Sequence, residues 1–149
     1  MVRPLTASRE NKTDGFYKSV TISNASMLTL NSVGYTLLTA PTNTTKVICM
    51  VSTFAFLAAG TAYSNVHDMT IAYGVPLSQG ATICTIPGTN FLDQTAATGV
   101  WASFSGTSSK GSIVTASSGA VSILAGTGDP TTGTSPLSIR MKYVIHTLA

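Results

Sequence analysis

The sequence predicts an all-β protein: a jelly-roll-like antiparallel β-sandwich with an extended N-terminal arm. Three observations support this prediction. Short segments with apolar residues at every second position follow one another, separated by turn residues such as Gly, Pro and Asn. Threonine and serine supply 24 and 18 of the 149 residues, and β-branched threonine suits a pleated surface. No segment keeps a helical period over a useful length, so two packed sheets are expected to bury the apolar residues.

The first 18 residues form the predicted arm, and residues 19–149 form the predicted sandwich domain. Six of the 13 charged residues lie in the arm, which is polar and has no usable periodicity. Its few apolar side chains do not offset the entropy that ordering costs. We therefore expect the arm to be disordered in the free protein and ordered on a partner.

The first half of the domain is expected to contain four strands, over residues 19–23, 26–30, 35–39 and 46–57. Pro41 separates the last two, because proline lacks the N–H donor that a central strand requires. The fourth segment is the longest expected strand. It is rich in β-branched and aromatic residues and has no polar face at helical spacing.

The second half is expected to contain six strands, over residues 69–73, 81–86, 100–105, 112–117, 120–125 and 137–145. Ser118 and Gly119 are a plausible hairpin turn between two of them. A single helical turn is expected within residues 87–94, where Phe91 and Leu92 would close one end of the core. Residues 126–136, rich in Gly, Thr and Pro, are expected to form a loop.

The last strand has the clearest alternation in the chain. We expect its apolar row to face the core, together with Val47, Cys49 and Val51 or their alternates on the longest strand. The row consists of Leu137, Ile139, Met141, Tyr143 and Ile145. His146 falls on the opposite, exposed face, where an interface or surface role is expected.

The domain is unusually poor in charge. Only seven charged residues follow Lys18, whereas about a quarter of an average chain is charged. Solubility normally depends on that charge. The composition therefore predicts that much of the domain surface is covered by other protein, in a homo-oligomer with a trimer favoured.

The composition argues against several classes of function. The net charge of +3 forms no basic stripe, so we expect no nucleic-acid binding. We expect no membrane span, because the most apolar stretch covers only residues 47–60, and no signal peptide is recognised. Cys49 and Cys84 are expected to be buried free thiols in a reducing compartment, with a disulfide as the alternative.

No catalytic, cofactor-binding or metal-binding residues are predicted, and we expect neither a small-molecule substrate nor an enzyme. His67 and Asp68 are the single suggestive pair, and a small hydrolase built on them is kept as an outlying alternative. Two distant histidines without a matching Cys or Glu cluster do not make a zinc signature. The glycines between residues 126 and 133 precede a strand and open no helix, so they lack the dipole that would hold a phosphate.

Three stretches resemble small all-β structural proteins of tailed bacteriophages, of the capsid decoration (cement) or fibre type. They are Ala40-Pro41 leading into Lys46-Val47-Ile48, the segment Met69-Thr70-Ile71-Ala72-Tyr73-Gly74, and the loop Asp129-Pro130-Thr131-Thr132-Gly133 before the closing strand. The resemblance covers residues 40–149 and lies in the general character of the sequence and in the order of its strands. It implies a jelly-roll-like trimer that sits on a capsid at three-fold positions and carries no catalytic residues.

The function expected from these observations is that of a homotrimeric capsid decoration protein. It would assemble in the host cytoplasm, lie on the capsid exterior of the virion, and bind and stabilise the lattice of the major capsid protein. The candidate capsid contacts are Arg3, Arg9, Lys12, Phe16, Tyr17 and Lys18. The alternative is a receptor- or glycan-binding domain of a phage tail or head fibre, in which exposed Trp101 and tyrosines line a sugar site.

Overall fold

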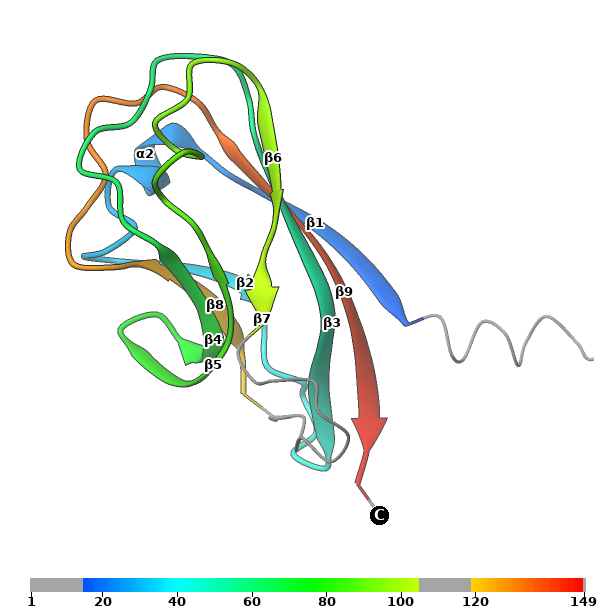
Figure 1. The fold of residues 1–149 in the computed structure, drawn as a ribbon. Helices are drawn as coiled ribbons and strands as arrows, with labels where there is room; N and C mark the ends of the chain where they lie inside the picture. Colours follow the sequence, from blue (N-terminus) through cyan, green and yellow to red (C-terminus); the bar gives the residue numbers. More distant parts are fainter. Residues whose placement is uncertain (1–14, 105–118, 149) are drawn as a thin grey trace, which may run out of the picture.

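A computed structural model of the chain describes residues 15–104 and 119–148. These residues form nine strands and one short helix (Figure 1). The elements are β1 (Phe16–Ile22), α2 (Asn24–Met27), β2 (Tyr35–Leu38), β3 (Lys46–Leu57), β4 (Met69–Val75), β5 (Ser78–Ile86), β6 (Thr98–Trp101), β7 (Ser103–Phe104), β8 (Val121–Ala125) and β9 (Leu137–Thr147).

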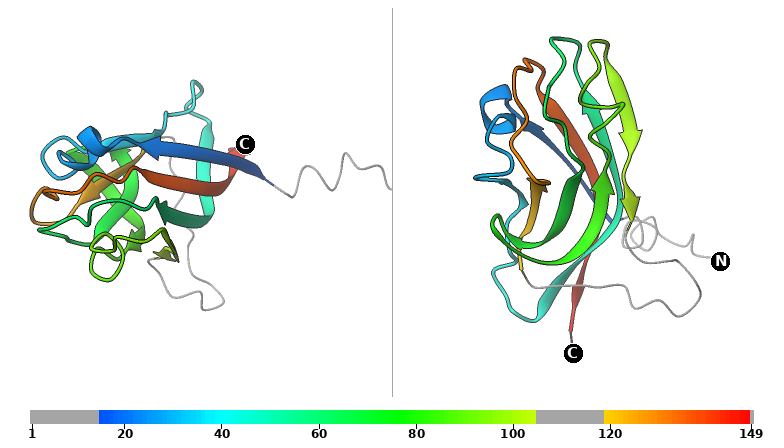
Figure 2. Two further views of the ribbon diagram at one scale, coloured as in Figure 1. Left: turned by 90° about the horizontal axis from the view of Figure 1, so that it is seen from above. Right: turned by 60° about the vertical axis from the view of Figure 1, so that its left-hand side comes forward.

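The strands form two antiparallel sheets that pack face to face (Figure 2). Sheet A has the order β1-β9-β3-β6, and sheet B has the order β2-β8-β4-β5-β7. If two-residue β7 is left aside, the pairs are nested: β1 with β9, β2 with β8, β3 with β6 and β4 with β5. The predicted all-β antiparallel sandwich is confirmed, while its assignment as a jelly roll stays a prediction.

The structure corrects the predicted boundary between arm and domain. Phe16, Tyr17 and Lys18 were expected in the arm, but they belong to β1 and pair with Tyr143, Lys142 and Met141 of β9. The reason is that the backbone of β9 offers them ladder hydrogen bonds, so ordering does not depend on their side chains alone. Residues 1–14 of the predicted arm lie outside the described residues.

The segment 26–30 is not a strand. Ser23 caps the short helix α2, and its side chain accepts a hydrogen bond from the Ser26 backbone N–H at 3.3 Å. Met27 and Leu30 are both fully buried, and residues three apart share one side of a helical turn. Their burial, rather than a two-residue alternation, decides the local structure.

The segment 100–105 is divided between the two sheets. β6 pairs with β3 in sheet A, and β7 pairs with β5 in sheet B. The chain crosses at Ala102, whose backbone N–H donates to the Thr53 carbonyl at 2.9 Å. The predicted strand over 112–117 and Ser118 of the predicted turn lie outside the described residues.

Side chains from the inner faces of both sheets fill the core. Phe91 and Leu92 are buried, and their backbone N–H groups donate to the Gly88 carbonyl at 3.3 and 2.8 Å, so the predicted closing turn is confirmed. Tyr73 of sheet B donates from its hydroxyl to the Ile48 carbonyl of sheet A at 2.9 Å. That bond joins the two layers inside the core.

The apolar row of β9 is only partly buried. Leu137, Ile139 and Met141 have no exposed surface, as expected, whereas Tyr143 is half-buried and Ile145 is 36% exposed. The end of β9 extends past the described part of sheet B (Figure 1), so Tyr143 packs only partly against the core and Ile145 is exposed.

Of the two sets expected on β3, the alternates lie beside this row: Ile48 pairs with Ile145 and Met50 with Tyr143. Past Val51 the partners of Met141, Ile139 and Leu137 are Thr53, Ala55 and Leu57. A shift in register between Met50 and Ser52 changes the alternation at Val51, which is 48% exposed. Such a bulge places one extra residue in a strand and redirects its side chains.

Candidate functional site

The pair His67 and Asp68 does not form an acid–base dyad in the described contacts. The His67 ring contacts the Thr127 hydroxyl at 3.2 Å and the Asn65 side chain at 3.2 Å. Asp68 Oδ1 instead accepts a hydrogen bond from the Gly88 backbone N–H at 3.0 Å. The two side chains thus hold different loops together, beside a hollow of about 410 Å³.

Among the described residues, no group of three or more His, Cys, Asp or Glu side chains is placed to hold a metal ion. No helix in the described part of the chain is long and apolar enough to cross a membrane. Cys49 and Cys84 are free, as expected, although Cys49 is only half-buried. Burial raises the pKa of the Cys84 thiol to about 11, and the nearby Thr53 hydroxyl partly opposes that rise.

The first candidate surface is the inner side of sheet A where β1 and β9 extend past sheet B. We call it the overhang and define it by Phe16, Lys18, Tyr143 and Ile145. The Phe16 and Tyr143 rings stack with their centroids 5.6 Å apart. Phe16 is 54% exposed and Lys18 is exposed. A hollow of about 290 Å³ lies between Lys18, Tyr143 and Ile145 of the overhang and the connection from β2 to β3.

The overhang contains two of the six predicted contact residues. Phe16 and Lys18 point to the inner side of sheet A, because neighbouring residues of a strand face opposite ways. Tyr17 points to the outer side, where the Lys142 ammonium lies 5.4 Å from the centre of its ring. Arg3, Arg9 and Lys12 lie outside the described residues.

The second candidate surface is the outer side of sheet A. We call it the aromatic–basic face and define it by Tyr17, Phe54, Phe56, Trp101, Arg140 and Lys142. The register brings one residue from each strand into a row across the sheet. This row consists of Ser19, Arg140, Phe54 and Trp101.

The aromatic side chains of this face support one another. Phe54 and Trp101 meet edge to face, with their ring centroids 5.0 Å apart. The Phe54 ring lies over Gly99, where an added Cβ would stand only 2.4 Å from the ring. An aromatic ring that covers a glycine on the next strand fills the space that a missing side chain leaves. Trp101 remains 67% exposed.

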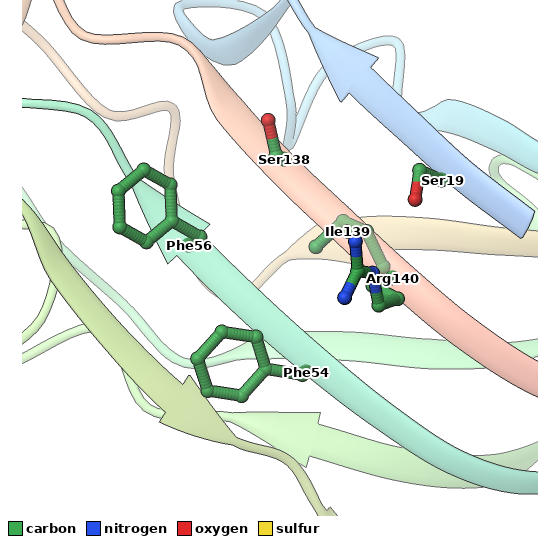
Figure 3. A pocket seen from close by; sticks show the side chains of 6 residues that line it. All are labelled: Ser19, Phe54, Phe56, Ser138, Ile139 and Arg140. Carbon is green, nitrogen blue, oxygen red and sulfur yellow. The ribbon is translucent and has the colours of Figure 1, made fainter.

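A hollow of about 360 Å³ lies on the aromatic–basic face (Figure 3). Phe54 and Phe56 project from the same side of β3, and Arg140 projects beside them from β9. The polar lining comes from Ser19 of β1 and Ser138 of β9. Ser138 also meets the Thr21 hydroxyl, at 3.4 Å.

The aromatic–basic face is positively charged. Arg140 and Lys142 lie on it, and no acidic residue occurs in the strands of sheet A. The three described carboxylates, Asp68, Asp93 and Asp129, lie in connections between strands. Hydrogen bonds from Ser32 and Asn31 lower the pKa of the Asp129 carboxyl. Its Oδ1 atom accepts from the backbone N–H groups of both residues, so this carboxylate joins two loops.

Sequence reasoning named Trp101 as a possible sugar contact but did not group it with the other residues of this face. A signal was available, because Phe54 and Phe56 are two apart on one strand and so are Arg140 and Lys142. Only the register shows that these pairs lie side by side. Comparisons with protein-family models, curated proteins and solved structures found no match.

Proposed function

We propose that this protein is a homotrimeric capsid decoration protein of a bacteriophage, which binds the major capsid protein from the outside of the virion and stabilises its lattice. The observation that carries the proposal is the overhang, an exposed apolar surface on an otherwise charge-poor sandwich. The role is mechanical and needs no catalytic residue. The finer assignment to phages comes from the resemblance of residues 40–149.

The nested pairing of the strands supports the structural role. When a long antiparallel hairpin folds over on itself, its first strand pairs with its last. The second strand pairs with the second-last, and this order continues inward to the two strands beside the hairpin turn. This is the order seen in sheets A and B, and we propose that the fold is a jelly roll. Jelly rolls recur in viral capsid proteins and in lectins. Such an analogy narrows the function class but does not choose within it.

The chemistry of the overhang suits a protein partner. Aromatic residues dominate the energetics of interfaces, because they bury large areas with little loss of side-chain entropy. Phe16 and Tyr143 supply two such rings, and Lys18 adds one cation. Along the chain the overhang follows residues 1–14, which contain the predicted contacts Arg3, Arg9 and Lys12. We therefore propose one contact area on an acidic region of the capsid protein.

The test is co-sedimentation of the purified protein with capsids from which it has been removed. The variant Phe16→Ala combined with Ile145→Ser is expected to weaken binding by about two orders of magnitude, as for the loss of interface anchors. Val75→Ser is the matched control, because Val75 is 56% exposed on sheet B. Equal binding by all three proteins would reject the overhang as the contact. No binding by the wild-type protein would reject the capsid role.

A second candidate function is a glycan-binding domain of a phage tail or head fibre. The observation that favours it is the aromatic–basic face, where Trp101 is exposed beside a hollow lined by hydroxyl groups. Labelling of virions separates the two functions. A lattice over the capsid surface supports decoration, and a signal at the tip of a fibre supports the second candidate.

A further inference from the structure

We propose that the hollow on the aromatic–basic face is a binding site for an acidic sugar, such as a uronic or sialic acid unit of an oligosaccharide. This inference deepens the second candidate function by naming its ligand class. It does not depend on the capsid role, because the overhang and the aromatic–basic face lie on opposite sides of sheet A.

The size and lining of the hollow fit a small ligand. Its volume of about 360 Å³ falls within the range of about 300–1,000 Å³ that is typical of small-molecule sites. Phe54 and Phe56 are two residues apart on one strand, so their Cα atoms are separated by about 7 Å. A pyranose ring has flat C–H faces that pack on aromatic rings through dispersion. The two phenylalanines provide such surfaces.

The polar groups set the orientation of the ligand. Ser19 of β1 and Ser138 of β9 line the hollow together with the two phenylalanines of β3. Each serine hydroxyl can donate one hydrogen bond and accept others. The pairing of Ser138 with Thr21 is long, at 3.4 Å, so it is weak compared with a sugar contact at normal distance. Hydroxyl groups on one side and aromatic rings on the other match the two kinds of surface that a sugar presents.

Arg140 selects for a carboxylate. Its guanidinium projects beside the rings of Phe54 and Phe56, and it has no ion-pair partner among the described residues. A planar guanidinium binds a carboxylate through two parallel hydrogen bonds. Lys142 adds a second positive charge on the same face, two residues along β9. A neutral sugar leaves Arg140 unused, whereas an acidic sugar pairs with it.

A second copy of the chain is a poorer occupant. If the aromatic–basic faces of two copies met around a two-fold axis, Arg140 and Lys142 of one copy would lie close to the same cations of the other copy. Like charges at an interface oppose association. The strands of sheet A contain no carboxylate that would relieve this repulsion.

The single tryptophan of the chain makes the site measurable. Trp101 contacts Phe54, which lines the hollow, so an occupant should change its fluorescence. The experiment titrates the full-length protein with trigalacturonic acid and with sialyllactose, and uses maltotriose and lactose as uncharged counterparts. We expect saturable changes with both acidic sugars and binding of the neutral sugars that is weaker by about tenfold or more, the loss of one charge-assisted contact.

Variants separate the roles of the lining residues. Arg140→Gln should weaken binding of the acidic sugars by about tenfold and leave the neutral sugars unchanged, because it removes the charge alone. Phe56→Ala should weaken both kinds of sugar. Val75→Ser is the control and should change neither. A urea midpoint unchanged from wild type shows that each variant is folded.

Two results would overturn the inference. One is the absence of any saturable signal with either acidic sugar up to about 10 mM, both in fluorescence and in amide chemical shifts of Ser19 and Arg140. The other is binding of a glutamate-rich peptide but of no sugar, which would assign the face to an acidic protein partner. Neither result bears on capsid binding by the overhang, which the co-sedimentation experiment measures separately.

Discussion

The outer faces of the two sheets present different side chains. The strands of sheet B contain no charged residue, and several of their outward positions hold hydroxyl-bearing side chains. These include Thr36, Thr70, Thr82 and Thr85, whereas Ala72 and Ser122 on the same side are fully buried. All four lysines and arginines among the described residues lie in strands of sheet A, whose outer side also has four exposed or half-exposed aromatic residues.

This difference shows that the shortage of charge is not uniform. The strands of sheet B have no cation, and Gln79 donates to the Ser122 carbonyl and hydroxyl at 3.0 Å each. Sheet A combines cations with large rings, the residue types that concentrate binding energy at interfaces. Sheet A, whose strands β1 and β9 extend past the described strands of sheet B, is therefore the sheet that has these residue types.

The largest expected effect tests whether the inner and outer sides of sheet A differ as described. Ile139→Ala should lower the free energy of unfolding by about 2–5 kcal/mol, because Ile139 is fully buried. Arg140→Ala, the next residue on β9, should change it by less than about 0.5 kcal/mol. Urea unfolding of both variants measures the contrast. Equal losses would mean that β9 does not alternate between core and solvent.

Alkaline pH should weaken the core that both sheets share. Burial raises the pKa of Cys84 to about 11 and those of Tyr63 and Tyr73 to about 12. Between pH 9 and pH 11 the unfolded chain releases the Cys84 proton and the folded chain keeps it. The free energy of unfolding should therefore fall by roughly 1.4 kcal/mol per pH unit for each such group.

The two tyrosines add to this slope above pH 10, where they ionise in the unfolded chain first. Urea unfolding at a series of pH values from 8 upward measures the effect. Cys84→Ala should flatten the part of the curve just above pH 9 while leaving the later part in place. A free energy of unfolding that stays constant through this range would contradict the burial of all three groups.

A smaller effect concerns the cation on the outer side of sheet A. Lys142 lies 5.4 Å from the centre of the Tyr17 ring, and exposed cation–π pairs contribute about 0.5–1 kcal/mol. A double-mutant cycle with Tyr17→Leu and Lys142→Met should give a coupling energy in that range. The equivalent cycle on sheet B, with Thr36→Val and Ser122→Ala, should give less. A coupling of zero in the first cycle would remove Tyr17 from the aromatic–basic face.

A small effect on stability is also expected at Gly99. An added methyl group would stand 2.4 Å from the tip of the Phe54 ring, which must move aside. Because the ring end is free to turn, Gly99→Ala should cost less than about 1 kcal/mol. The fluorescence of Trp101 should nevertheless change, since it depends on contact with Phe54. An unchanged spectrum would mean that the two rings do not pack as described.

Local pattern predicted most of the strands. Residues 46–57 were predicted as one strand and form β3 with the same bounds. The alternation in residues 137–145 identified β9 and the burial of its first three apolar residues. These predictions succeeded because a strand with one buried face has apolar residues at every second position. The helical turn at residues 26–30 was missed, because Met27 and Leu30 are too few to establish a helical period.

The candidate surfaces were only partly predictable. Phe16 and Lys18 were named as contacts because they belong to the predicted arm, and the structure places both on the overhang. Their expected neighbours Arg3, Arg9 and Lys12 lie outside the described residues. The aromatic–basic face could not be assembled from the sequence, because its residues come from four strands that are not consecutive in the chain.

The sequence by itself determined the all-β class, the positions of the longer strands and the poverty of charge after residue 18, since composition and two-residue alternation are local properties. Tertiary structure decided which strands are neighbours, where β3 changes register and which end of β9 extends past the described strands of sheet B. Strand pairing joins residues that are far apart in the chain, and local pattern does not encode that choice. Arg140 and Trp101 therefore share one face only because β9, β3 and β6 lie side by side.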